Sequence, residues 1–388
     1  MKQLTVKLSA ALLLTLFLSV KAKSQDDGTI NVVTSAVPFL RISPDARAGG
    51  MGDVGIATTP DANASFWNLA KTPFATSRTS ISTTYTPWLK DLGLNDVYLA
   101  SLAGYHQLDE EQAVSASIRY FSLGNIQFTD FAGNDLQSFR PREFSVDLGY
   151  SRKLSEKLGV GIALRYINSN LAGGAQLNGV SYKTGSAVAA DLSLFHNGIN
   201  EEGTGWNWGI TLSNLGSKIS YTSDALQKDY IPANLGLGVA HTWAFDETSR
   251  FTAGLDINKL MVPTPPALRD DSTINDYRNK SVISSWFSSF GDAGGDELKE
   301  YQVSIGGEYG YNDQFFARAG YFYENKFKGN RKYFTLGVGL KYNVFGLNFS
   351  YLVPSGAGVN RNPLSNTLRF SLVFDLDSET NGGGTAAP

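Results

Sequence analysis

The stretch that decides the fold is Phe334-Thr335-Leu336-Gly337-Val338-Gly339-Leu340-Lys341-Tyr342. Apolar side chains occupy every second position, and small or polar residues lie between them. Roughly ten residues of this alternation are typical of a transmembrane β-strand, whose apolar side faces lipid and whose polar side faces the barrel lumen. A soluble β-sandwich also hides one face of each strand, so this stretch alone leaves two fold classes open.

The same alternation recurs from residue 77 to residue 376. We count about fourteen such segments, an even number that is typical of bacterial barrels. We therefore predict an all-β fold, a 14-stranded antiparallel transmembrane β-barrel. Its strands are expected near residues 78–88, 95–107, 112–123, 142–153, 157–169, 185–196, 205–215, 232–245, 250–260, 299–310, 314–324, 332–342, 345–353 and 365–376.

The links between these segments alternate in length. Every second link is short, as at residues 155–156 and 343–344, whereas the links between them are long, as at residues 124–141 and 354–363. Short turns of bacterial barrels lie in the periplasm and long loops lie outside. The longest predicted outer loop spans residues 261–298.

Ten charged residues within the predicted strands fall on the face opposite the aliphatic side chains. Five are acidic and five are basic, so they can pair with one another inside a lumen. A soluble sandwich would instead expose charge densely, yet only 18% of this chain is charged, which favours the barrel. The predicted lumen charges are Arg119, Asp147, Arg165, Asp191, Asp256, Glu308, Arg318, Lys341, Arg369 and Asp375.

Composition and the N-terminus indicate an exported protein. Lys2 and Lys7 precede an apolar run over residues 10–20, and small residues follow at positions 22 and 24, so residues 1–24 are predicted to be a signal peptide. The run is too short to span a membrane comfortably as an anchor helix. Cysteine is absent and the net charge is -3, which argues against disulfides, thiolate metal sites and nucleic-acid binding. We expect an integral outer-membrane protein without a cofactor or a metal, and a flexible tail over residues 377–388.

Residues 25–76 do not alternate and are rich in Gly, Ala and Asp between Ile42 and Lys71. We expect this segment to form a plug inside the barrel lumen, paired with the lumen charges. A G-x-G-x-x-G match begins at Gly50, but neither flank provides the strand and helix that a dinucleotide site needs. The plug residues expected to matter for folding and pore closure are Asp45, Arg47, Gly50, Gly52, Asp53, Asp61 and Asn68.

The plug and strands together resemble the FadL-like outer-membrane barrels, which transport long-chain fatty acids and other hydrophobic compounds. Those proteins carry Asn-Pro-Ala just before the first strand, and this chain has Asn68-Leu69-Ala70 there. The closer resemblance is to the PorV family of the type IX secretion system, a FadL-like group. It is carried by the residues at 42–53, 60–63 and 67–68, which read ISPDARAGGMGD, PDAN and WN.

This resemblance implies a role in protein secretion. PorV-like proteins associate with the large outer-membrane translocon subunit and bind the C-terminal signal domain of cargo. They then carry cargo to the surface attachment and peptidase complex, among membrane lipids that include lipopolysaccharide. A lipopolysaccharide deacylase role has also been proposed for the family. We expect no enzyme here, because His106, His196 and His241 all fall near the short links rather than in the outer loops.

Partner binding is expected in the outer loops. Val282, Ile283, Trp286, Phe287 and Phe290 have the spacing that a short amphipathic helix places on one face. Such a face packs on the barrel rim, lies on lipid or docks a partner. We expect Ile283, Trp286, Phe287 and Phe290 to dock a partner, with Trp88 and Leu89 of the first outer loop as second choices.

The alternative function is transport of hydrophobic small molecules across the outer membrane. It requires an apolar pocket in the lumen. The predicted lumen face is instead rich in charge, Gly and Ser, with scattered aromatic side chains such as Phe121, Phe195, Phe316 and Phe322, which weighs mildly against a transporter.

Overall fold

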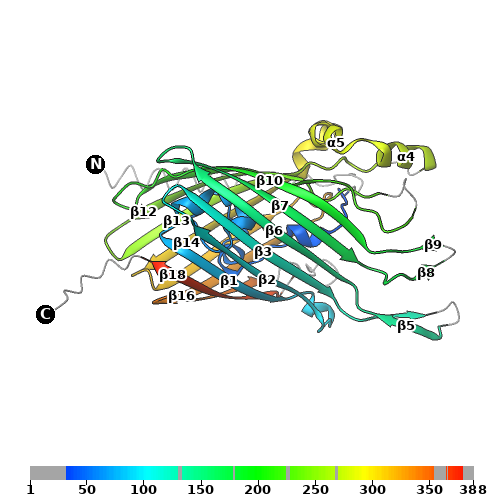
Figure 1. Cartoon of the computed structure of the whole chain (residues 1–388), viewed down its shortest axis with the longest axis horizontal. Coiled ribbons are helices and arrows are strands. Elements are labelled where there is room, and N and C mark those ends of the chain that lie inside the picture. The colour runs from blue at the N-terminus through cyan, green and yellow to red at the C-terminus, as the bar shows by residue number, and fades with distance from the viewer. Residues whose placement is uncertain are drawn as a thin grey trace, which may run out of the picture. The chain divides into compact units, whose positions relative to one another are not determined.

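The computed structural model describes residues 32–129, 133–177, 180–223, 228–266, 270–353, 364 and 366–378. Fourteen antiparallel strands form a closed barrel in which each strand pairs with its neighbour along the chain, and β1 pairs with β18. Every predicted strand is present, and no end differs from its prediction by more than three residues. The predicted all-β barrel is therefore confirmed, including its strand number (Figure 1).

The wall strands are β1 (Ser77–Pro87), β2 (Val97–Gln107), β3 (Gln112–Leu123), β6 (Arg142–Lys153), β7 (Leu158–Asn170), β10 (Gly185–His196), β11 (Gly205–Gly216), β12 (Asn234–Ala244), β13 (Ser249–Leu260), β14 (Tyr301–Tyr311), β15 (Phe315–Tyr323), β16 (Lys332–Tyr342), β17 (Phe345–Val353) and β18 (Leu368–Ser378). Two short hairpins extend the outer links, β4 (Ile126–Thr129) with β5 (Asp135–Phe139) and β8 (Gln176–Leu177) with β9 (Val180–Ser181). The predicted signal peptide and residues 379–388 of the predicted tail lie outside the described residues.

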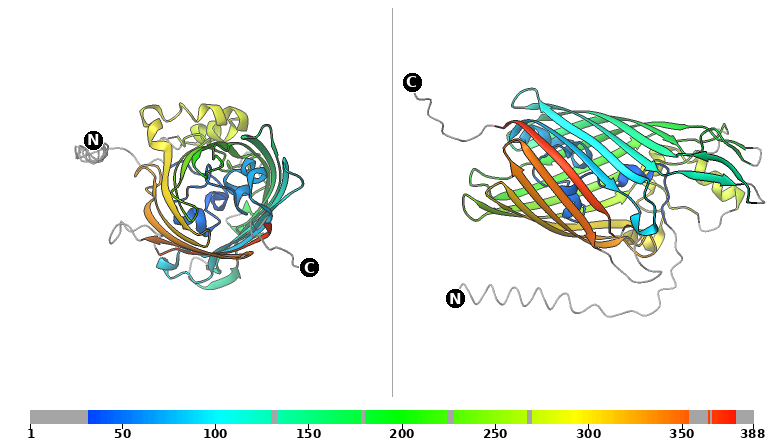
Figure 2. Two further views of the ribbon diagram at one scale, coloured as in Figure 1. Left: turned by 90° about the vertical axis from the view of Figure 1, so that its left-hand side faces the viewer. Right: turned by 90° about the horizontal axis from the view of Figure 1, so that it is seen from below.

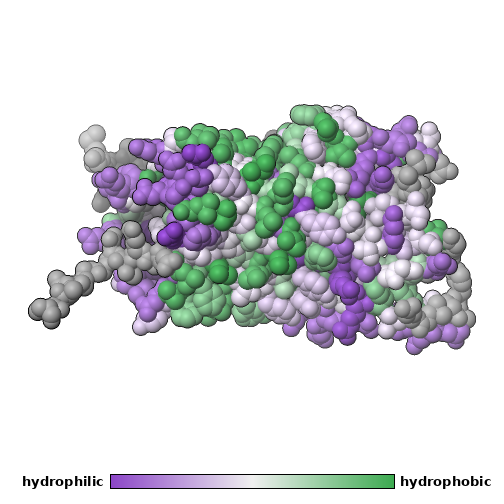
Figure 3. Space-filling view, viewed as in Figure 1, coloured by the Kyte–Doolittle hydropathy of each residue, from purple (hydrophilic) through white to green (hydrophobic). Residues whose placement is uncertain are grey.

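The outer face of the wall is apolar, as a lipid-facing surface must be. Large side chains such as Leu148, Leu164 and Val188 are more than half exposed, and apolar residues cover the middle of the space-filling view (Figure 3). Trp206, Trp208 and Trp243 lie near the short-link end of the wall. Trp208 stacks on His196, whereas Trp206 meets His241 edge-on and Trp243 lies tilted against it. An aromatic girdle of this kind is typical of a membrane interface. No helix of the described part is long and apolar enough to cross a membrane.

The lumen holds residues 32–76, the described part of the chain that precedes β1. This plug contains η1 (Pro38–Arg41), α2 (Ala46–Gly50), α3 (Ala64–Trp67) and η2 (Leu69–Phe74), and it lies inside the ring of strands in the view along the barrel (Figure 2). The side chain of Asp45 accepts a hydrogen bond from the Ala48 amide at 2.8 Å and starts α2. Asn68 caps η2 in the same way at the Ala70 amide.

Glycines of the wall strands form the surface against which the plug packs, and we call this surface the seat. Gly306 and Gly320 face the lumen where Met51 approaches, and a Cβ at either glycine would lie 2.1 Å from the Met51 backbone. Gly52, next along the plug, has a φ of +70° that other residues rarely adopt. The glycine-rich lumen face is therefore a contact surface for the plug.

Gly320→Ala is expected to destabilise the folded barrel by about 1–3 kcal/mol, because the new methyl group overlaps backbone rather than a flexible side chain. The measurement is urea unfolding of the purified protein, followed by tryptophan fluorescence. Gly291→Ala is the matched control, since a Cβ there meets no atom within 4 Å and should change stability by less than about 0.5 kcal/mol. Equal stability of the two variants would contradict the role of Gly320 as a close contact for the plug.

Candidate functional site

The longest outer loop joins β13 to β14 and carries α4 (Asp271–Asn279), α5 (Val282–Ser288) and η4 (Gly294–Glu300). The helices lie at the long-loop end of the barrel (Figure 1). A side chain caps the N-terminus of α4 and of α5. Asp270 accepts a hydrogen bond from the Thr273 amide at 2.8 Å, and Ser281 accepts one from the Ser284 amide at 3.2 Å.

The end of α4 is tied to the neighbouring outer loop between β11 and β12. Lys218 donates from Nζ to the carbonyl oxygens of Arg278 at 2.6 Å and Lys280 at 2.7 Å. The Tyr230 hydroxyl donates to the carbonyl oxygens of Tyr277 at 3.0 Å and Lys280 at 2.9 Å. These bonds satisfy carbonyls that a helix end leaves free, so the helix pair has a fixed position on the rim.

The far end of the loop is held by Glu300. Its carboxylate accepts hydrogen bonds from Lys259 at 2.5 Å, Lys328 at 2.8 Å and the Thr264 hydroxyl at 2.8 Å. Burial by itself would raise the pKa of Glu300, but these hydrogen bonds outweigh it and hold the pKa below its usual value. The loop therefore depends on an ionised Glu300.

Acid is expected to loosen this loop. Because the folded-state pKa of Glu300 is depressed, its contribution is complete above the unfolded-state pKa of about 4.3 and is lost as the pH falls through the lower folded-state value. Hydrogen exchange of residues 282–300, corrected for intrinsic rates, should be constant between about pH 7 and pH 5 and rise below about pH 4. In Glu300→Gln the same amides should already exchange faster at pH 7. Identical profiles for the two proteins would contradict this role.

Helix α5 presents large apolar side chains to its surroundings and small polar ones to the protein. Ser285 and Ser289 are fully buried, whereas Ile283 is 63% exposed, Phe287 74% and Phe290 40%. Val282 and Trp286 lie on the same side of the helix by spacing, but they are half-buried and present less surface than the other three apolar residues. The small serine side chains let α5 pack closely on the rest of the protein. Ile283, Phe287 and Phe290, at positions i, i+4 and i+7, then point outward.

Two other predicted docking residues are not available for docking. Trp88 is only 9% exposed and packs in an apolar cluster with Val37 and Phe39 of the plug. Leu89 is half-buried against the same cluster. The Trp88 amide bonds the Val97 carbonyl at 2.9 Å, so the link folds back over the plug instead of projecting outward. The expectation that these two side chains are exposed is corrected accordingly.

The plug residues meet the lumen charges through a central ion network. Arg47 donates to both carboxylate oxygens of Glu308 at 2.8 and 3.0 Å and pairs with Asp61 at 2.9 Å. Arg318 bonds Glu308 from the wall at 2.6 Å. Asp256 accepts the amides of Gly55 and Ile56 at 2.7 and 2.9 Å.

Further contacts hold the plug together and fix it to the wall. The indole nitrogen of Trp67 donates to Asp45 at 2.7 Å, and the Asn68 amide group donates to the Leu194 carbonyl at 3.0 Å. The backbone of Gly50 lies against that of Gly337 of β16.

The remaining lumen charges pair along the wall. Arg165 forms ion pairs with Asp147 and with Asp191, the latter at 2.8 Å, and Arg119 lies 3.7 Å from Asp147. Near the short-link end, Lys341 pairs with Asp375 at 2.6 Å. Both groups add rigidity to the wall rather than charge to an open channel.

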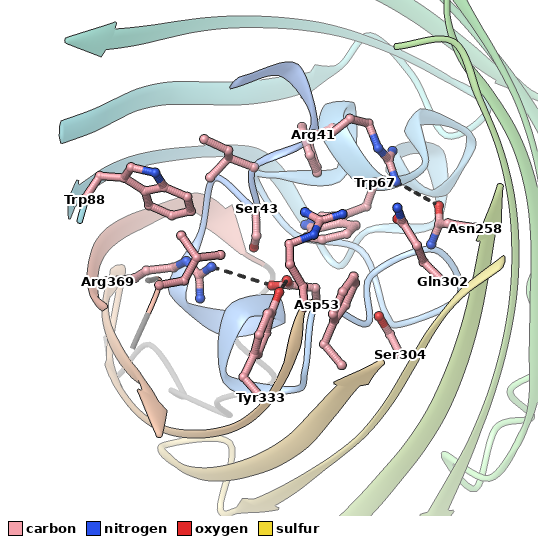
Figure 4. Close-up of a pocket in the computed structure, with 15 residues that line it drawn as sticks. Arg41, Ser43, Asp53, Trp67, Trp88, Asn258, Gln302, Ser304, Tyr333 and Arg369 are labelled. Atoms are coloured by element: carbon pink, nitrogen blue, oxygen red, sulfur yellow. Dashed lines mark hydrogen bonds and ion pairs between the residues drawn. The ribbon is translucent and has the colours of Figure 1, made fainter. Parts of the chain in front are cut away.

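A small cavity of about 50 Å³ lies where the plug meets the wall (Figure 4). Asp53 of the plug accepts a hydrogen bond from the Tyr333 hydroxyl at 2.7 Å and lies 3.8 Å from Arg369. Arg41 donates to Asn258 at 3.2 Å. Sequence reasoning missed Arg41 and Tyr333. The inward parity of Tyr333 on β16 could have revealed it, but Arg41 lies in the plug, which has no strand period.

Comparisons with known proteins agree with this geometry. Residues 23–267 match the protein family described as "Type IX secretion system protein PorV". The chain belongs to the PorV family. It is therefore an outer-membrane component of the type IX secretion system, and its partners are those of that system. No curated protein matches the sequence.

Solved structures of similar fold are transport barrels. The toluene transporter TbuX of Ralstonia pickettii is 13% identical, with a TM-score of 0.53 over 86% of this chain and 98% of that one. The toluene transporter TodX of Pseudomonas putida is 14% identical, with a TM-score of 0.50 over 89% of this chain and 98% of that one. At these identities the likeness shows the fold alone.

Proposed function

We propose that this PorV-family barrel binds the C-terminal signal domain of cargo at its outer end. It would receive cargo at the large translocon subunit and carry it to the surface attachment and peptidase complex. The contact surface is the outward face of α5, which we call the apolar face and define as Ile283, Phe287 and Phe290. Residues 1–24 would direct export, and residues 25–76 would close the lumen. Residues 377 and 378 of the predicted tail belong to β18, so the tail would begin at residue 379.

The observation that carries the proposal is the exposure of this apolar face on a helix that is otherwise held firmly. Large aromatic side chains dominate the energy of protein interfaces. A rigid surface also loses little conformational entropy on binding. The contacts of Lys218, Tyr230 and Glu300 supply that rigidity at both ends of the loop.

The plug supports an adaptor rather than a channel. The plug occupies the lumen and is held there by ion pairs and backbone contacts with the wall. The cavity at its outer side is small and lined by arginines. A transporter of hydrophobic compounds would need an apolar path there. The apolar face could instead lie on the lipid of the outer leaflet, including lipopolysaccharide, which predicts no cargo binding at all.

The test is a pull-down with the purified barrel as bait. A secreted protein should be retained only when its C-terminal signal domain is present, and retention after that domain is trimmed would refute the proposal. The transporter alternative predicts that deletion of the gene impairs uptake of a hydrophobic solute and leaves secretion intact.

A further inference from the structure

The cavity of Figure 4 lies between plug and wall near the outer mouth of the barrel. The plug contributes Arg41, Ser43 and Asp53 to its lining, and the wall contributes Tyr333 and Arg369. Arg331, from the outer link between β15 and β16, also lines it, and its side chain is 36% exposed. The lining of the cavity therefore includes a partly exposed side chain of the outer rim.

Positive charge exceeds negative charge around this cavity. Three guanidinium groups line it, and the carboxylates beside them are Asp53 and Glu324, which pairs with Arg331 at 2.8 Å. Within the described part of the chain, Arg41 forms no ion pair with a carboxylate, and its side chain donates a hydrogen bond to the neutral Asn258. A partly buried cation that no carboxylate pairs with directly is costly, and a bound anion offsets that cost.

Arg369 supplies the second observation. Its side chain is 2% exposed, yet Nε and Nη1 have no hydrogen-bond partner among the described residues. The Ser43 hydroxyl is also buried and unpartnered within that part of the chain. Figure 4 shows Arg369 and Tyr333 converging on Asp53 from the wall, with Ser43 beside them. Buried polar groups normally have partners, so these donors indicate a ligand that accepts hydrogen bonds.

We propose that this cavity binds a small oxyanion, a carboxylate or phosphate group, held by Arg369 of the wall and Arg41 of the plug. Guanidinium groups suit such planar or tetrahedral acceptors. A volume of about 50 Å³ holds a few water-sized groups and no hydrocarbon chain, since one water needs about 10–15 Å³. The anion would join plug to wall at the outer side, and this role is independent of cargo binding.

The experiment measures binding of inorganic phosphate to the full-length protein in detergent, by calorimetric titration and by the rise in Tm. Acetate is the carboxylate probe, and chloride at equal ionic strength controls for screening. We expect saturable binding and a raised Tm with phosphate, acetate or both, and whichever acts identifies the ligand class. If neither exceeds chloride, the proposal is overturned.

Variants separate this site from general charge effects. Arg41→Gln and Arg369→Gln should each weaken binding at least about tenfold, because each removes one charged donor. Arg250→Gln, an exposed arginine paired with Asp313, is the matched control and should bind like the unaltered protein. Should Arg369→Gln fail to fold, Arg41→Gln decides the matter, and undiminished binding in that variant would overturn the proposal.

Discussion

Phe287→Asp is expected to reduce retention of the cargo signal domain by roughly 30-fold or more, the effect of losing an interface hot spot of about 2 kcal/mol. Phe287 is the most exposed member of the apolar face, at 74%. The substitution places a charge where the partner must become desolvated. It removes no contact of the barrel itself, so the Tm of the purified variant should be unchanged. The readout is the dissociation constant for an isolated signal domain.

The matched control for this prediction is Ser284→Asp. It adds the same charge to the same helix, on an exposed position outside the apolar face, and should bind cargo within about threefold of the unaltered protein. Equal binding by both variants would remove α5 from the interface. Equal loss in both would show that charge near the rim matters, and not the apolar face.

The barrel wall could be predicted from sequence because its physical constraints repeat at every strand. Each strand must be apolar toward lipid and polar toward the lumen, so a period of two appears in segments such as residues 332–342. The alternation of short and long links then fixes the number of strands. Charged residues such as Arg318 follow the same parity, and their inward placement follows directly from it.

The plug and the outer loop could be predicted only in outline. The seat at Gly306 and Gly320 depends on where Met51 lies, and a glycine in a strand carries no record of the backbone that approaches it. For α5, helical spacing groups the apolar residues but cannot say which face meets the protein. Two buried serines decide the orientation, and serine is normally expected on the solvent side. Trp88 was misplaced for a similar reason, since an outer link can fold inward over a plug.

Glu308→Ala is expected to give the largest loss of stability, about 3–5 kcal/mol, because it breaks a buried ion network. The Glu308 carboxylate joins Arg47 of the plug to Arg318 of the wall. Without it, the guanidinium groups of Arg47 and Arg318 are left with one neighbouring carboxylate, that of Asp61, which pairs with Arg47. One carboxylate is too little negative charge for two enclosed cations. Urea unfolding measures the stability. Conductance across a planar bilayer measures closure of the lumen and should rise if the plug loosens.

Two controls separate the network from charge in general. Arg250→Ala breaks the ion pair with Asp313. The side chain of Arg250 is 47% exposed and that of Asp313 is 70% exposed, so the loss of stability should be no more than about 1 kcal/mol. Glu308→Gln keeps the shape and the acceptor oxygen but removes the charge, so its loss should fall between those of Glu308→Ala and Arg250→Ala. If Glu308→Ala is no less stable than Arg250→Ala, the plug is held by its backbone contacts with the wall glycines, and the ion network is dispensable. A stability loss without a rise in conductance would mean that the network stabilises the wall through Arg318 while the plug stays in place.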